Sequence, residues 1–122
     1  MTARRPLALR FLSGRFQGAV VPIDPARPML LGRQQGSDLL LPEELVSRRH
    51  ARLAYEGGEL VLEDLGSTNG TYLNGVRVTR ARVSEGDRVL LGQSILKVVP
   101  RDPSPALSAE EVRAGLERAS VT

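Results

Sequence analysis

The chain has 122 residues, of which 41% are hydrophobic and 25% charged, the composition of one soluble globular domain. It has no cysteine, which excludes disulfides, thiolate metal sites and cysteine catalysis, and a single histidine, His50, which excludes a histidine-cluster metal site. No apolar run approaches the roughly 20 residues of a membrane helix, and the basic N-terminus lacks the apolar core of a signal peptide. We therefore expect a cytoplasmic protein without metal, cofactor or membrane contact.

The net charge of +3 rests on 16 arginines and one lysine, Lys97. A GC-rich bacterial genome would explain this bias. Recognition of a phosphate would also explain it, because the planar guanidinium fork binds such anions better than an ammonium does. Residues 1–61 hold nine basic and six acidic residues, whereas residues 62–122 hold eight of each. An anion site is therefore expected to draw on the first half of the chain.

Short apolar segments alternate with turn signals, and no segment before residue 104 has a sustained helical period. The pairs Gly57-Gly58 and Asn74-Gly75 suit tight hairpins, because these residue types reach positive φ at little cost. The pattern predicts an antiparallel β-sandwich or barrel. The expected strands cover residues 7–12, 19–23, 29–32, 39–41, 50–55, 59–65, 71–73, 76–78, 88–92 and 94–99.

The composition changes after Pro100. A proline-containing linker leads to a predicted short helix that Ser108 caps, with Glu111 completing a capping box. Val112, Leu116 and Ala119 form its narrow apolar stripe. We therefore divide the chain into a β domain over residues 1–100 and a linker with a short amphipathic helix or tail over residues 101–122.

The sequence gives no support for an enzyme. There is no Walker-type loop and no GxGxxG after a strand. Ser47 and His50 lie three residues apart, which on an extended chain places their side chains on opposite faces and disfavours a catalytic pair. The adjacent acids at 43–44 and 63–64 likewise point to opposite faces of a strand. We expect no catalytic residues.

Nucleic-acid binding is an alternative that the sequence pI of about 10.2 raises. Base stacking on a sheet requires clusters of exposed aromatic side chains. The aromatic residues here are dispersed, at positions 11, 16, 55 and 72. We therefore expect no nucleic-acid partner, although nonspecific attraction to phosphate backbones stays open.

Polar residues gather in three segments, at 32–33, 47–51 and 67–71. Alternate loops of an antiparallel sandwich fall at the same end. Together these loops would offer two guanidinium groups, hydroxyls and an amide to a dianion with three acceptor oxygens. The same residues would also serve simply as turn formers and solvated arginines, and the residues alone leave both interpretations open.

The order GR…SRRHA…LEDLGSTNGTYLNG…EGDRVLLG closely resembles the forkhead-associated (FHA) domain. Hallmarks of that family are a Gly-Arg pair, a Ser-x-x-His motif and an Asn-Gly within a Ser-Thr-Asn-Gly loop. Gly32-Arg33, the motif at 47–50 and the loop at 67–70 match them in order and spacing. The resemblance runs from about Leu7 to Val99, and no hallmark position departs from the pattern.

The resemblance implies an all-β fold, an eleven-strand antiparallel β-sandwich of FHA/SMAD-like type. It also implies binding of phosphothreonine peptides through loops at one end, without catalysis. In such a site Arg33 would pair with the phosphate, Ser47 would donate its hydroxyl to it, and Arg48 would add a further contact. Thr68 would line the phosphothreonine pocket, and Asn69 would hydrogen-bond the peptide main chain.

Structural support of the site is implied for Gly32, His50 and Gly70, with His50 holding the Ser47 loop in place. The loop at 42–46 would help to read the third residue after the phosphothreonine. Its apolar Leu45 and Val46 and its two glutamates favour an apolar or basic residue there.

These features predict a monomeric adaptor in bacterial Ser/Thr-kinase signalling, whose partners are phosphothreonine-containing kinase substrates. The alternative function is a phospho-independent scaffold that assembles through a sandwich face or the C-terminal helix. A scaffold would have no need of Arg33, Ser47 and Asn69.

Overall fold

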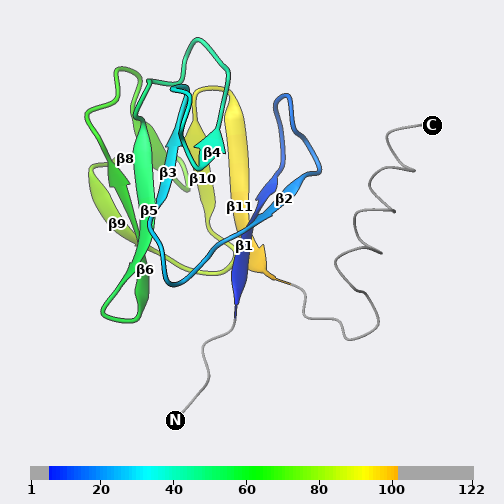
Figure 1. Ribbon diagram of the computed structural model, residues 1–122, viewed down its shortest axis with the longest axis vertical. Helices are drawn as coiled ribbons and strands as arrows, with labels where there is room; N and C mark the ends of the chain where they lie inside the picture. Colours follow the sequence, from blue (N-terminus) through cyan, green and yellow to red (C-terminus); the bar gives the residue numbers. More distant parts are fainter. Residues whose placement is uncertain (1–5, 102–122) are drawn as a thin grey trace, which may run out of the picture.

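The computed structural model describes residues 6–101, and every regular element in this range is a β-strand (Figure 1). The helix predicted within residues 101–122 lies outside the described residues. The strands are β1 (Leu7–Phe11), β2 (Val20–Pro22), β3 (Met29–Gly32), β4 (Leu39–Leu40), β5 (Ala51–Glu56), β6 (Glu59–Asp64), β7 (Thr71–Leu73), β8 (Val76–Val78), β9 (Arg80–Val83), β10 (Arg88–Leu91) and β11 (Ser94–Pro100).

The eleven strands form two sheets that pack as a sandwich, which confirms the predicted fold class (Figure 1). One sheet has six strands in the order β2-β1-β11-β10-β7-β8, and the other has five in the order β4-β3-β5-β6-β9. All strand pairs are antiparallel except β3 with β4, which is parallel. Strand β9 was not among the predicted strands, because two of its four residues are arginine and it has no apolar run.

The core lies between the sheets and follows from the period-two alternation of the strands. In β1, Leu9 and Phe11 are buried while Arg10 between them is exposed, and in β11 Leu96 and Val98 are buried around half-buried Lys97. Each such pair fills the space between the sheets and sends the intervening cation outward. Burial of these residues therefore fixes the register of the central strands β1 and β11.

Two hairpins form as the sequence predicts. Gly57 and Gly58 link β5 to β6 with φ of 57° and 86°, and Asn74 and Gly75 link β7 to β8 with φ of 51° and 86°. Positive φ at both central residues gives a turn whose twist matches that of the flanking strands. Residues 6–101 contain no helix that is long and apolar enough to cross a membrane.

Three loops that follow strands of the five-stranded sheet meet at one end of the sandwich, the upper end in Figure 1. They follow β3, β4 and β6, and the tight β10–β11 turn lies beside them. The β5–β6 turn lies at the opposite end. The fold thus gathers the three predicted polar segments at a single end.

Candidate functional site

The loop after β3 is tied to the loop before β5 by the residues around Arg33. The main-chain N–H of Arg33 donates to the carbonyl of Ser47 at 3.0 Å, and its Nε donates to the carbonyl of Val46 at 2.9 Å. The side chain is exposed, and no other partner of its guanidinium lies within residues 6–101. One edge of the guanidinium is therefore held by the protein, and its two terminal nitrogens can bind a ligand.

Gly32 allows this close approach of the two loops. A Cβ at this position would lie 2.1 Å from the carbonyl oxygen of Arg48, far inside van der Waals contact. That carbonyl accepts a hydrogen bond from the N–H of Gln34 at 3.1 Å, so it cannot move away freely. Any side chain at position 32 would separate Arg33 from the Ser47 loop.

His50 connects the Ser47 loop to the β6–β7 loop and is fully buried. Its Nδ1 accepts the main-chain N–H of Ser47 at 3.0 Å, and its Nε2 lies 2.9 Å from the carbonyl of Gly70. Because Nδ1 is the acceptor, the proton of the neutral ring sits on Nε2 and is donated to Gly70. The ring is thus fully committed to main-chain groups, and it is not a base for the Ser47 hydroxyl.

The hydroxyl of Ser47 faces the β6–β7 loop. Its oxygen accepts the main-chain N–H of Thr68 at 3.0 Å, which leaves its own O–H free to donate. Thr68 is exposed and Ser47 is half-buried. A ligand that accepts from Ser47 would therefore lie against Thr68 as well.

Asn69 links the β6–β7 loop to the β4–β5 loop. Its Nδ2 donates to the carbonyl of Leu45 at 3.0 Å, and the side chain remains exposed. The side-chain oxygen and the second amide hydrogen are left for a ligand, and these are the groups that could pair with a peptide main chain. Gly70 follows with φ of 90°, a conformation that L side chains rarely adopt.

Asp64 organises the β6–β7 loop from within, a role that the sequence analysis did not identify. Its carboxylate accepts from the hydroxyl of Ser67 at 2.5 Å, the hydroxyl of Thr71 at 2.6 Å and the N–H groups of Gly66 and Ser67 at 3.0 and 3.1 Å. Burial raises the pKa of this carboxyl, but the hydrogen bonds outweigh it, so the pKa lies below its usual value. An Asp with Gly and Ser two and three residues further on indicates such a turn, because aspartate bonds to N–H groups at those positions.

Glu43 differs from the expectation that it offers its charge to the peptide. One carboxylate oxygen accepts the N–H of Gln93 at 3.0 Å, and the other accepts the hydroxyl of Ser94, so Glu43 supports the β10–β11 turn. Of the two glutamates in this loop, only Glu44 is exposed, and Leu45 is 43% exposed. Val46, which was expected to add apolar surface beside Leu45, is fully buried. The loop therefore exposes Glu44 and Leu45 but not Val46.

The structure also brings Arg77 of β8 to the site, which the sequence analysis missed. Its Nε lies 2.8 Å from where a Cβ of Gly70 would be, and Tyr72, its cross-strand partner, lies 3.2 Å from the same point. Arg77 is exposed, as are Arg48 and Arg49. None of these three side chains forms an ion pair with a residue between positions 6 and 101. The two-residue turn at 74–75 already requires residues 72 and 77 to be partners, so this neighbour could have been predicted.

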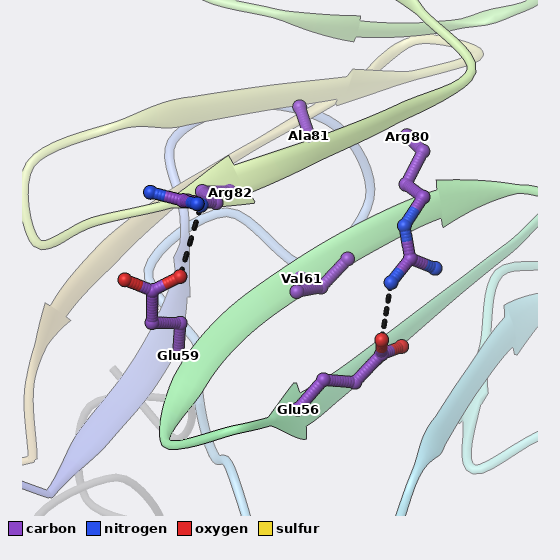
Figure 2. Close-up of a pocket in the computed structure, with 6 residues that line it drawn as sticks. All are labelled: Glu56, Glu59, Val61, Arg80, Ala81 and Arg82. Carbon is purple, nitrogen blue, oxygen red and sulfur yellow. Dashed lines mark hydrogen bonds and ion pairs between the residues drawn. The ribbon is translucent and has the colours of Figure 1, made fainter.

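A surface hollow of about 400 Å³ lies elsewhere, on the outer side of the five-stranded sheet (Figure 2). Arg80 pairs with Glu56 and Arg82 pairs with Glu59 at 2.9 Å across it, over the side chain of Val61. Its charges are therefore neutralised within the protein. It contains none of the predicted site residues, so the chemistry of the loops gives the better candidate.

The site has the character of a receptor for a phosphate-bearing peptide. Arg33, Ser47, Thr68 and Asn69 are joined through hydrogen bonds across three loops, and Arg48 and Arg77 lie beside them. Their unused groups are mainly donors and cations, as a dianion with three acceptor oxygens requires. Fold and site together define a phosphopeptide-binding β-sandwich module.

The chain belongs to the FHA domain family. The family model described as FHA domain matches residues 29–92, slightly more than half of the chain. FHA domains bind phosphothreonine peptides, and the chain is an interaction module of this type rather than an enzyme. Both conclusions confirm the resemblance read from the sequence.

Relatives from mycobacteria agree with this assignment. FHA domain-containing protein FhaB of Mycobacterium tuberculosis is 42% identical over 101 residues, covering 80% of this chain and 64% of FhaB. Glycogen accumulation regulator GarA of Mycolicibacterium smegmatis is 47% identical over 62 residues, covering 51% of this chain and 39% of GarA. The chain thus spans less than two thirds of the length of either relative.

Solved structures show the same fold. One, described as an analysis of phosphothreonine-dependent FHA domain interactions, has a TM-score of 0.71 and 31% identity, covering 80% of this chain and 98% of that one. The FHA domain of an Arabidopsis thaliana protein has a TM-score of 0.76 and 29% identity, covering 82% and 90% of the two chains.

Proposed function

We propose that this protein is a cytoplasmic, monomeric adaptor in bacterial Ser/Thr-kinase signalling. Its partners are proteins that carry a phosphothreonine placed there by a Ser/Thr kinase. One observation carries the proposal: hydrogen bonds join three loops and bring together Arg33, Ser47, Thr68 and Asn69. Each keeps at least one polar group free for a ligand while its other groups hold the loops in place.

Each site residue has a defined role in this proposal. The terminal nitrogens of Arg33 and the hydroxyl of Ser47 bind the phosphate, and the exposed guanidinium of Arg48 adds a further charge. Thr68 lines the pocket beside Ser47. The free amide groups of Asn69 bind the peptide main chain and fix its register. Gly32, His50 and Gly70 keep the loops at their observed separation.

The energy available is sufficient for a regulatory interaction. A phosphothreonine carries about −1.5 to −2 charge near neutral pH, and each charge-assisted hydrogen bond contributes about 1.5–3 kcal/mol net. Arg33, Ser47 and one further donor therefore supply much of the roughly 8 kcal/mol that a micromolar complex requires. Main-chain contacts to Asn69 and one side-chain contact near exposed Leu45 supply the remainder.

The test is fluorescence anisotropy of the full chain against a degenerate phosphothreonine peptide library. The phosphoserine, glutamate and unphosphorylated versions serve as ligand controls. Arg33→Ala is expected to abolish binding, whereas Arg27→Ala, which removes an exposed arginine from the β2–β3 loop, is expected to have no effect. Binding that needs both the phosphate and Arg33 supports the proposal.

Two results would contradict it. Unchanged affinity in a folded Arg33→Ala protein would exclude the assigned site. A folded wild-type protein that binds no phosphopeptide would favour the phospho-independent scaffold, which analytical ultracentrifugation would then reveal as self-assembly.

A further inference from the structure

The two sheets of the sandwich differ sharply in charge. The strands of the five-stranded sheet contain three arginines and four acidic residues. Its arginines pair with glutamates on its outer face, as in the hollow of Figure 2. The strands of the six-stranded sheet contain four basic residues and no acidic residue. One outer face is thus neutralised internally and the other is not.

Three of these cations lie directly opposite one another. Arg10 of β1 pairs in register with Lys97 of β11, and Lys97 pairs in register with Arg88 of β10. Their neighbours along each strand are core residues, so all three side chains leave the outer face. Directly opposite side chains on a sheet lie about 5 Å apart, and like charges in such pairs are destabilising.

No acid of the described chain relieves this row. None of the three side chains forms an ion pair with a residue between positions 6 and 101. The nearest acid in sequence, Asp87, is committed to the N–H of Ser84 at 2.8 Å and to the side chain of Asn74 at 3.1 Å. The row therefore stands as a concentrated positive charge that the domain itself does not balance.

The row beside it, toward the binding loops, is apolar. Leu90 of β10 and Ile95 of β11 are cross-strand partners, half-buried, and Leu90 also pairs with Tyr72. The strands of this sheet contain two aromatic residues, Phe11, which lies in the core, and Tyr72, which is half-buried. The face therefore lacks the exposed aromatic side chains on which single-stranded nucleic acids stack. A cationic row next to an aliphatic row suits a polypeptide rather than a nucleic acid.

We propose that this outer face, the row of Arg10, Lys97 and Arg88 with Leu90 and Ile95, is a second binding surface that takes an acidic protein segment with interspersed apolar residues. In an extended segment, alternate side chains are about 6.8 Å apart. The rows on the sheet are two residues apart along each strand and so have the same spacing. An acidic side chain then faces the cations while the next side chain on that face meets Leu90 and Ile95.

This surface is independent of the phosphothreonine site, because it uses none of that site's residues and lies on a sheet face rather than on the loops. The probe is an unphosphorylated peptide of repeating Glu-Ser-Val-Ser, in which each glutamate and the valine two residues on lie on the same face of the extended chain. The control peptide has glutamine in place of glutamate. Titration of the isotope-labelled full chain at physiological ionic strength, followed by NMR, is expected to shift the signals of Arg10, Arg88 and Lys97 saturably with the acidic peptide alone.

The decisive variant is Lys97→Glu, which places a negative charge between two arginines. It is expected to weaken the acidic peptide about tenfold, since attraction becomes repulsion at the centre of the row. Arg27→Glu makes the same change of net charge on an exposed loop and is expected to leave the affinity unchanged. Arg33→Ala is also expected to bind the acidic peptide normally, even if the phosphothreonine site is disproved. The control for folding is a cooperative thermal unfolding transition of the Lys97→Glu protein.

Several outcomes would overturn the proposal. Shifts confined to the β4–β5 and β6–β7 loops and lost in Arg33→Ala would place the peptide in the phosphate site. Unweakened binding by folded Lys97→Glu would exclude the cationic row. Tighter binding of an oligothymidylate than of the peptide would identify the face as a nucleic-acid surface, and absence of saturable binding would leave it without an acidic ligand.

Discussion

Replacing Asp64 with alanine is expected to lower the free energy of unfolding by about 3 kcal/mol, although Asp64 touches no ligand in the proposed complex. Its carboxylate accepts four hydrogen bonds within the β6–β7 turn. Two donors, the hydroxyls of Ser67 and Thr71, belong to residues only 7% and 0% exposed. A buried donor without a partner costs about 1–3 kcal/mol. Water can replace the carboxylate at the N–H of exposed Gly66, so the donors of Ser67 and Thr71 set the magnitude.

The assay is urea unfolding followed by circular dichroism. For a domain of this size the loss corresponds to a fall in melting temperature of roughly 12 °C. The control is Asp24→Ala, whose carboxylate accepts a single bond from the N–H of Ala26 at 2.8 Å in an exposed loop. It is expected to lose less than about 1 kcal/mol. Equal losses in the two variants would refute the reasoning, because the count and burial of the bonds would then not matter.

The pH dependence of stability gives a second test of Asp64. Its pKa is lowered in the folded state, so its stabilising contribution is complete above the unfolded pKa of about 3.9 and is lost as the pH falls through the folded pKa. Asp64→Asn cannot titrate at this position. Its urea midpoint is therefore expected to fall less steeply than that of the wild type below about pH 4. If the urea midpoints of the two proteins fell in parallel, another carboxylate would govern the loss of stability at low pH.

Three further variants test other parts of the structure. Gly32→Ala is expected to destabilise the domain by about 3 kcal/mol in urea unfolding, because its Cβ would meet the carbonyl of Arg48 at 2.1 Å; full stability would contradict that contact. Lys97→Glu is expected to raise the unfolding free energy by about 1 kcal/mol, since two attractive cross-strand pairs replace two repulsive ones, and a lower melting temperature would contradict this. Arg77→Ala is expected to weaken phosphothreonine peptides with acidic flanks by about threefold, measured by anisotropy. An equal effect on neutral peptides would assign it another role.

Local signals account for most of the fold. Strand segments and the hairpins at 57–58 and 74–75 follow from apolar alternation and from residues that accept positive φ. Strand β9 fails this test because Arg80 and Arg82 face outward toward glutamates of β5 and β6. These arginines are favourable in the strand because glutamates of the neighbouring strands pair with them. A run of apolar residues in the sequence cannot reveal such cross-strand partners.

The supporting groups of the site were harder to predict than the residues proposed to meet the ligand. The latter lie in compact motifs that can be recognised in one dimension. Glu43 accepts hydrogen bonds from Gln93 and Ser94, about fifty residues away in the sequence. The residues next to Glu43 in the sequence do not indicate this contact. Such roles depend on which loops the sandwich places side by side, and this is a property of the complete topology.

The hydrogen bonding of the loops supports the proposal that this site binds a phosphate. Carbonyls of Leu45, Val46 and Gly70 accept bonds from Asn69, Arg33 and His50, and the oxygen of Ser47 accepts the N–H of Thr68. These four acceptors are therefore occupied, whereas the remaining groups of Arg33 and Ser47 are donors. Because these bonds exist before the ligand arrives, binding requires little further ordering of the loops. A tetrahedral dianion uses several of these donors at once, whereas a glutamate, with one charge on a planar group, does not.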